Sequence, residues 1–335
     1  MHQAPRVASP SRRKMGASLM PFDNRITQML GVDYPIVQAP MGWIARSTLA
    51  SAVSNAGGLG IIETSSGELD NIRTEIAKMR ELTDKPFGVN IAQAFVRDPD
   101  IVSFVVDQGV KFVTTSAGDP ARYCGQLKEA GLIVFHVVPS LKAALKAVEA
   151  GVDGLVVEGG EGGGFKNPRD VATMVLLPLV AERTGVPIIA AGGVKDGRTM
   201  AAAFALGAEG VQMGTRMVSA AESPVHDNWK NSIINAEETD TVMLRGEQGP
   251  AMRALRTNRT NRLEKEPPEV LFSELQNALD LYFGGDMEAA IALTGQVAGR
   301  IDAVKPVSQI ISETVAEFEE TIASMGRAYA SSITA

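Results

Sequence analysis

The residues best suited to chemistry lie in one glycine-rich stretch, "LVVEGGEGGGFKNP", at residues 155–168. Glycine loses more backbone entropy on ordering than any other residue, so five glycines within residues 159–164 need a reason. Either the backbone approaches a ligand closely there, or the segment is a flexible connector. Glu161 and Lys166 add a carboxylate and an amine, which can both transfer protons. We therefore treat them as candidate catalytic residues, with a surface-exposed pair as the alternative.

His136 is a third catalytic candidate, because histidine both donates and accepts protons near neutral pH. It lies in "IVFHVVPS", residues 133–140, in an apolar run that is typical of a strand. A buried histidine in a strand is alternatively a packing residue. His226 is interpreted as a lid or hinge residue, and Cys124 lies on a predicted helix.

Two further loops are rich in glycine and precede predicted helices. They read "AAGGVKDG" at residues 190–197 and "QMGTRM" at residues 212–217. Bare backbone N–H groups at the start of a helix suit a phosphate. The residues that would present them are Gly192, Gly193, Gly214 and Thr215. The alternative is that both loops are tight turns that only lead into helices.

Two strand ends carry side chains that suit a flat ring. In "QAPMGWIA", residues 38–45, Pro40 restricts the backbone and Met41 offers a soft apolar surface. Asn90 ends "FGVN" with an amide that can hydrogen-bond the edge of a heteroaromatic ring. Met and Asn at such positions are, taken alone, more often packing or turn residues.

The elements that must position these residues are short apolar runs alternating with amphipathic helical segments. Such alternation predicts parallel βαβ units. Eight units, with polar or glycine residues after nearly every strand, favour a closed (β/α)₈ TIM barrel over an open sheet. The predicted strands are residues 35–40, 59–62, 87–91, 112–116, 132–138, 154–159, 187–193 and 210–215.

The pattern divides the chain into four parts. Residues 1–22 are rich in Pro, Ser and Arg and are predicted to be a disordered extension, and residues 23–221 form the barrel. Residues 222–306 lack the βα repeat and are predicted to be a smaller, mostly helical lid or substrate domain. Residues 307–335 are predicted to form a helix that packs back on the barrel.

Composition excludes several classes of function. A net charge of −7 argues against nucleic acid as a partner, because phosphate binding needs a basic face. No apolar run approaches the roughly 18 residues of a membrane span. A single cysteine suits a reducing cytoplasm, and with three histidines it leaves no obvious metal cluster. We expect a cytoplasmic enzyme that acts on a small-molecule substrate. The enzyme itself could form a homodimer.

Several of these motifs resemble one family when they are taken together. The segments at residues 31–62, 84–91, 187–198 and 206–217 are similar to those of the nitronate monooxygenase (2-nitropropane dioxygenase) family. Flavin-dependent enoyl-ACP reductases share the same barrel. The resemblance covers residues 24–300 and implies non-covalent FMN, with "TGQVAGRI" (294–301) folding over it. The residues that it places around FMN are Ala39, Pro40, Met41, Asn90, Gly163, Gly164, Gly192, Gly193, Gln212, Gly214 and Thr215.

The glycine-rich stretch departs from the family at one position. Family members commonly read an acid, two small residues, glycine and then histidine, whereas this chain reads "EGGGF". Phe165 therefore occupies the place of the expected base, and phenylalanine has no proton to exchange. His136, Glu161 and Lys166 are the candidates to replace it.

Three functions agree with these residues. The first is oxidation of alkyl nitronates with O₂ through FMN, where an anionic substrate needs little base catalysis. The second is NAD(P)H-dependent reduction of an activated C=C bond, as in an enoyl thioester, or of a quinone. Arg253, Arg256 and Arg259 could then bind a phosphate or carboxylate, unless they form a solvated basic face. The third is a non-catalytic barrel. The family resemblance favours the first.

Overall fold

Eight parallel strands form a closed barrel, which confirms the predicted fold class. The computed structural model describes residues 22–65, 69–269 and 271–330, so all but the last residue of the predicted extension lies outside them. Around the barrel the strands follow the order β1-β9-β8-β6-β5-β4-β3-β2. They are β1 (Ile36–Gln38), β2 (Gly60–Glu63), β3 (Phe87–Ala92), β4 (Phe112–Ser116), β5 (Ile133–Val138), β6 (Gly154–Glu158), β8 (Ile188–Ala191) and β9 (Gly210–Met213).

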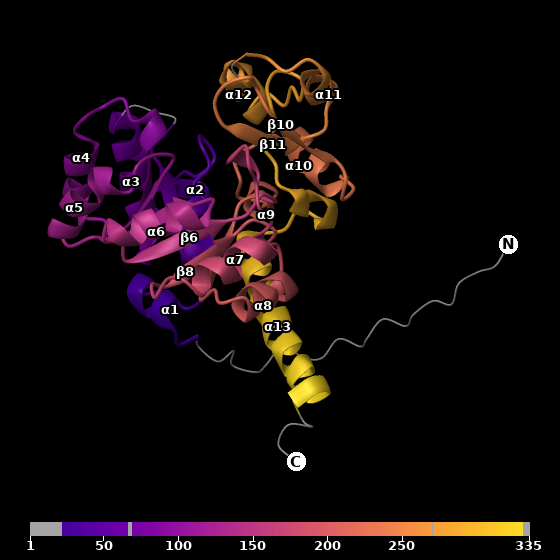
Figure 1. Ribbon diagram of the computed structural model, residues 1–335. Helices are drawn as coiled ribbons and strands as arrows, with labels where there is room; N and C mark the ends of the chain where they lie inside the picture. The colour runs from indigo at the N-terminus through magenta and orange to yellow at the C-terminus, as the bar shows by residue number, and fades with distance from the viewer. Residues whose placement is uncertain (1–21, 66–68, 270, 331–335) are drawn as a thin grey trace.

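Closure of the barrel depends on a short contact between its first two strands. The Leu59 N–H donates to the Ile36 carbonyl at 2.9 Å, and the Gln38 N–H donates to the Leu59 carbonyl at 3.0 Å. Figure 1 shows α1 (Arg25–Leu30) beneath the barrel. Its Ile26 and Leu30 belong to the apolar cluster that fills the barrel interior. The open end is therefore the opposite one, where the strands end.

Helices cover the outside of the barrel and are held by a second, larger apolar cluster. Their inward faces are small or branched aliphatic residues, so the two layers pack closely. None of the described helices combines the length and the apolar character that a membrane crossing requires. The covering elements are α2 (Ser47–Asn55), α3 (Leu69–Leu82), η1 (Gln93–Phe95), α4 (Ile101–Asp107), α5 (Ala121–Glu129), α6 (Leu141–Glu149), α7 (Thr173–Ala181), α8 (Gly197–Ala205) and α9 (Thr215–Val218).

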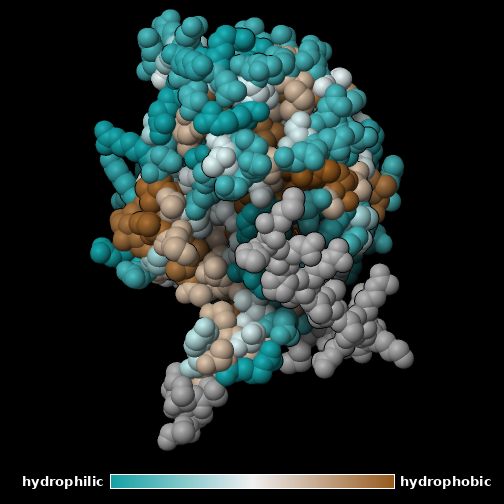
Figure 2. Space-filling view, turned by 90° about the vertical axis from the view of Figure 1, so that its right-hand side faces the viewer, coloured by the Kyte–Doolittle hydropathy of each residue, from teal (hydrophilic) through white to brown (hydrophobic). Residues whose placement is uncertain are grey.

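A second region lies above the open end of the barrel (Figure 1). Figure 2 shows mainly hydrophilic side chains over its outer surface in that view. Its interior is a separate apolar cluster that includes Val242, Met252 and Leu263. Its elements are α10 (Asp227–Ile234), β10 (Thr241–Leu244), β11 (Ala251–Leu255), α11 (Asn258–Lys265), η2 (Leu271–Leu275), α12 (Ala278–Tyr282) and η3 (Gln296–Arg300).

The strand pair in this region was not anticipated from the sequence. β10 and β11 are antiparallel, and β11 also pairs with β7 (Gly164–Lys166), which belongs to the loop after β6. A three-residue strand carries no readable periodicity, so only the pairing identifies it. As a result, the second region and the glycine-rich loop share one sheet.

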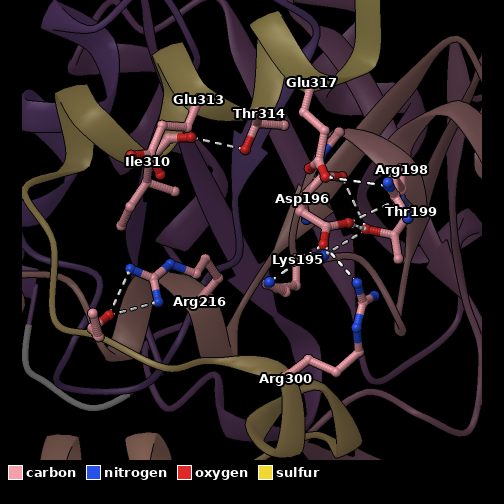
Figure 3. A network of polar contacts seen from close by, with 12 residues as sticks. Lys195, Asp196, Arg198, Thr199, Arg216, Arg300, Ile310, Glu313, Thr314 and Glu317 are labelled. Carbon is pink, nitrogen blue, oxygen red and sulfur yellow. Dashed lines mark hydrogen bonds and ion pairs between the residues drawn. The ribbon is translucent and has the colours of Figure 1, made fainter. Parts of the chain in front are cut away.

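The last described helix, α13 (Val307–Met325), continues into η4 (Gly326–Ala330) and lies against α8 and α2. The Glu317 carboxylate accepts the Gly197 N–H at 2.9 Å at the start of α8 (Figure 3). Asp196 caps the same helix and accepts from Arg300 at 2.7 Å, while Arg216 donates to the Ala303 carbonyl. This polar network ties the loop after β8 to the C-terminal part of the chain.

Candidate active site

A cavity of about 1080 Å³ lies at the carboxyl ends of the barrel strands and reaches into the second region. This volume lies at the upper end of the range typical of ligand pockets, roughly 300–1,000 Å³. The predicted catalytic and cofactor-binding residues, with Phe165, all line its wall, although their contact with a cofactor stays a prediction. They are Ala39, Pro40, Met41, Asn90, His136, Glu161, Gly163, Gly164, Phe165, Lys166, Gly192, Gly193, Gln212, Gly214 and Thr215.

The glycine-rich stretch is a compact turn and not a connector. A Cβ atom on Gly163 would lie 2.7 Å from the Gly295 nitrogen and from the Thr294 carbonyl carbon. Gly192, in the neighbouring loop, has a φ of +86° and would meet the Gly159 oxygen at 3.0 Å. Glycine is therefore required here because the chain packs against itself, a reason that the sequence could not separate from approach to a ligand.

Glu161 is engaged by the start of a helix. Its carboxylate accepts the Thr173 N–H at 2.9 Å and the Thr173 hydroxyl at 2.9 Å. A carboxylate at this position satisfies an N–H that would otherwise lack a partner within α7. Through these bonds Glu161 holds the glycine turn against α7.

His136 lies on the outward side of β5 and is one of the residues that line the cavity. It alternates with Phe135, which belongs to the cluster inside the barrel, and lies on the same side as Val134 and Val138. The imidazole Nδ1 and the Thr115 hydroxyl are 2.7 Å apart. Burial lowers the pKa of His136 from 6.5 to about 4, so the ring is neutral at pH 7.

This pKa predicts a pH-dependent stability. The unfolded chain protonates His136 at a higher pH than the folded protein does, so acidification favours unfolding. Between pH 6.5 and pH 4 we expect His136 to account for a loss of up to about 3 kcal/mol in the free energy of unfolding. The His136→Gln variant should lose that much less across the same window in urea titrations. Parallel pH profiles of the two proteins would contradict the assignment.

Lys166 and Glu158 form an ion pair in the cavity wall. Lys166 is only 6% exposed, and its Nζ donates to the Glu158 carboxylate at the end of β6. Little water reaches the amine, and the pair brings an amine and a carboxylate, two groups able to transfer protons, to the cavity wall. Glu158 was missed from the sequence, although an acid directly after a buried strand of a barrel is the usual signal of an active-site residue.

Gln212 provides the test of whether a flavin fits. It is 7% exposed at the end of β9, and its Oε1 finds no hydrogen-bond partner among the described residues. An amide oxygen that is left without a donor in a cavity wall suits a ring N–H of a bound molecule. Gly193 (φ +77°) and Gly214 expose backbone in the adjacent loops, so the residues present fit a flavin and its phosphate.

The segment at residues 294–301 closes one side of the cavity, as the resemblance implies. The Gly295 N–H donates to the Thr215 hydroxyl at 2.8 Å, and the Gln296 N–H donates to the Glu161 carbonyl at 2.9 Å. The Trp229 indole donates to the Thr294 hydroxyl at 3.1 Å. The segment thus joins the second region to the loops after β6 and β9.

The three arginines of the second region contact the chain itself. Arg253 is buried and donates to the Gly160 carbonyl at 2.7 Å, which holds the glycine turn. Arg256 pairs with Glu264, and Arg259 pairs with Glu274. These bonds favour a structural role over the binding of a substrate phosphate.

The barrel, its cavity and the glycine loops after its last two strands are those of an α/β-barrel enzyme whose site suits a phosphate-bearing cofactor. The sequence pattern of nitronate monooxygenase matches residues 23–101 and 92–317, and the chain belongs to that family. The predicted family is confirmed, and the protein is a flavin-dependent oxidoreductase.

Proteins similar to this chain carry names that describe different activities. The structure of FabK from Thermotoga maritima superposes with a TM-score of 0.85 at 41% identity, covering 91% of this chain and 98% of that one. In Mycobacterium tuberculosis (strain ATCC 25618 / H37Rv), a (3aS,4S,5R,7aS)-5-hydroxy-7a-methyl-1-oxo-octahydro-1H-indene-4-carboxyl-CoA dehydrogenase is 40% identical over 242 residues, 71% of this chain and 68% of that protein. A probable nitronate monooxygenase of Staphylococcus aureus (strain JH9) is 28% identical, covering 89% of this chain and 98% of that protein.

Proposed function

We propose that the protein is an FMN-dependent oxidoreductase that interconverts a saturated and an α,β-unsaturated acyl thioester. The observation that carries this proposal is the buried Lys166–Glu158 pair in the cavity wall. Forming or reducing the C=C bond requires a proton to leave or reach the carbon next to the carbonyl, so a proton-transferring group is needed. A nitronate is already anionic and has no such need.

The residues that would hold FMN lie on one side of the cavity. Backbone N–H groups at Gly192, Gly193 and Gly214 suit its phosphate, and Gln212 Oε1 suits a ring N–H. Bound FMN would supply the acceptance or donation of a hydride. NAD(P)H is the proposed reductant where the reaction runs toward the saturated thioester.

The chain's own groups would handle the proton. The Lys166 ammonium would give a proton to the α carbon of the substrate when the double bond is reduced, and the Glu158 carboxylate would hold the ammonium in place. In the opposite direction the uncharged Lys166 amine would take the α proton. Phe165, in the place of the family histidine, adds an apolar ring to the wall of the same cavity.

Nitronate oxidation with O₂ is the second candidate, favoured by the family pattern and by the staphylococcal relative. Anaerobic mixing of the FMN-loaded protein separates the two. We expect the flavin absorbance to bleach with butyryl-CoA, or with NADH or NADPH, and to return on addition of crotonyl-CoA. Bleaching by propyl-2-nitronate alone, with no response to either thioester, would replace the proposed function by the second candidate.

A further inference from the structure

Three phenylalanine rings form a continuous apolar surface in the cavity, which we name the phenyl wall: Phe95, Phe165 and Phe272. We propose that this wall is the binding site for a rigid, ring-bearing apolar part of the substrate. The inference rests on the proposed function in one respect: the thioester to which this apolar part is attached. The wall itself is defined by the positions of the rings.

The rings contact one another from three separate parts of the chain. Phe95 belongs to η1 after β3, Phe165 to β7, and Phe272 to η2 of the second region. The centroid separations are 5.4 Å for Phe95 and Phe165, 5.5 Å for Phe95 and Phe272, and 5.8 Å for Phe165 and Phe272. All three lie within the range of stable aromatic pairs, about 4.5–7 Å.

The orientation of the rings indicates what shape would bind there. Phe272 is stacked on Phe165 with an interplanar angle of 20° and on Phe95 with an angle of 27°. Phe95 and Phe165 are tilted by 46°, so the stacked rings form a rigid cluster that offers ring edges and partly exposed faces to the cavity. A rigid ring system can pack against this cluster without losing internal rotations. A flexible chain would have to lose those rotations on binding, so a rigid ring is favoured over a linear chain.

The wall lies next to the proposed proton-transferring pair. Phe165 and Lys166 are adjacent in β7, and successive side chains of a strand point to opposite faces. Phe165 packs toward the apolar cluster of the second region, whereas Lys166 reaches Glu158. Both residues nevertheless line the same cavity, so a substrate with its ring system on the wall would keep its reacting carbons near the strand that carries Lys166.

Phe272 is the residue whose change tests the wall without disturbing the core. It remains 45% exposed, so its substitution leaves a small cavity at most. Phe283 is a matched control, because it is also 45% exposed in the second region but is not among the residues that line the cavity. Phe272→Tyr keeps the ring and serves as the conservative variant.

The experiment measures the binding of naphthalene-2-carboxylate and decanoate to the FMN-loaded protein by equilibrium titration. The two probes have similar numbers of carbon atoms and differ in rigidity. In Phe272→Ala we expect the Kd of naphthalene-2-carboxylate to rise about tenfold and that of decanoate to change by less than about twofold. Phe283→Ala and Phe272→Tyr should bind both probes as the unchanged protein does.

Equal weakening of both probes in Phe272→Ala, or no change in either, would overturn the inference. Because binding of these probes needs no turnover, the result is independent of the reaction. A selective loss of naphthalene-2-carboxylate with no activity on thioesters would support the wall and refute the proposed function. Turnover of thioesters together with equal weakening of both probes in Phe272→Ala would support the proposed function and refute the wall.

Discussion

Lys166→Met should lower acyl-thioester turnover by about 100-fold or more while the protein retains its FMN. General acid–base groups contribute roughly 10²–10⁴-fold to the reactions that they assist. Methionine keeps much of the apolar volume of the lysine stem but has no proton to transfer. The loss should fall on kcat, because the substrate still meets an unchanged phenyl wall. Steady-state kinetics with flavin content measured by absorbance give both quantities.

A matched control separates chemistry from the loss of a buried charge. Lys230 is also 6% exposed and lies 3.9 Å from Asp227, but it does not line the cavity. Lys230→Met should keep turnover per bound FMN within about twofold of the unchanged protein, since it touches no proposed substrate position. If Lys166→Met retained more than a tenth of the turnover, Lys166 would not be the proton-transferring group.

Gly163→Ala is expected to lower the free energy of unfolding by about 1–3 kcal/mol, the usual range for overpacked sites. The added methyl group would lie 2.7 Å from backbone atoms of Thr294 and Gly295, which cannot rotate away as a side chain would. Displacing them would also weaken the hydrogen bond from the Gly295 N–H to the Thr215 hydroxyl. Because this segment borders the proposed FMN site, we expect FMN affinity to fall at least about tenfold. Urea unfolding and FMN titration measure the two effects.

The control for this prediction is Gly185→Ala. A Cβ atom at Gly185 would meet nothing within 4 Å, and the residue lies outside the cavity wall. Alanine there should leave stability within about 0.5 kcal/mol and FMN affinity unchanged. If Gly163→Ala behaved like Gly185→Ala, the contact between the glycine turn and residues 294–295 would not hold the site together.

The barrel was readable from the sequence because each βα unit is local. Each of the eight predicted strands coincides with an observed one to within a few residues. Apolar runs of four to seven residues between amphipathic segments have few other solutions, since both faces of such a strand must be buried. The family motifs then identified which strand ends carry the site.

The pairing of β7 with β11 could not be predicted in the same way. It joins residues that are almost ninety positions apart, such as Phe165 and Met252, and neither segment is long enough to show periodicity. The partner of Arg253 was hidden for the same reason, because its bond to the Gly160 carbonyl forms only once the second region folds onto the barrel. The partners of Glu161 and Lys166 are nearer in the sequence, but the fold of the glycine turn decides that they meet Thr173 and Glu158.

The sequence by itself determined the barrel, the family and the glycine-lined end of the barrel, because these depend on periodicity and on short motifs along the chain. Only the tertiary structure decided what surrounds Phe165. Phe95, Phe165 and Phe272 meet because the loop after β3, the glycine turn and the second region converge on one cavity. Contacts of this kind depend on packing between distant segments, which local patterns do not encode.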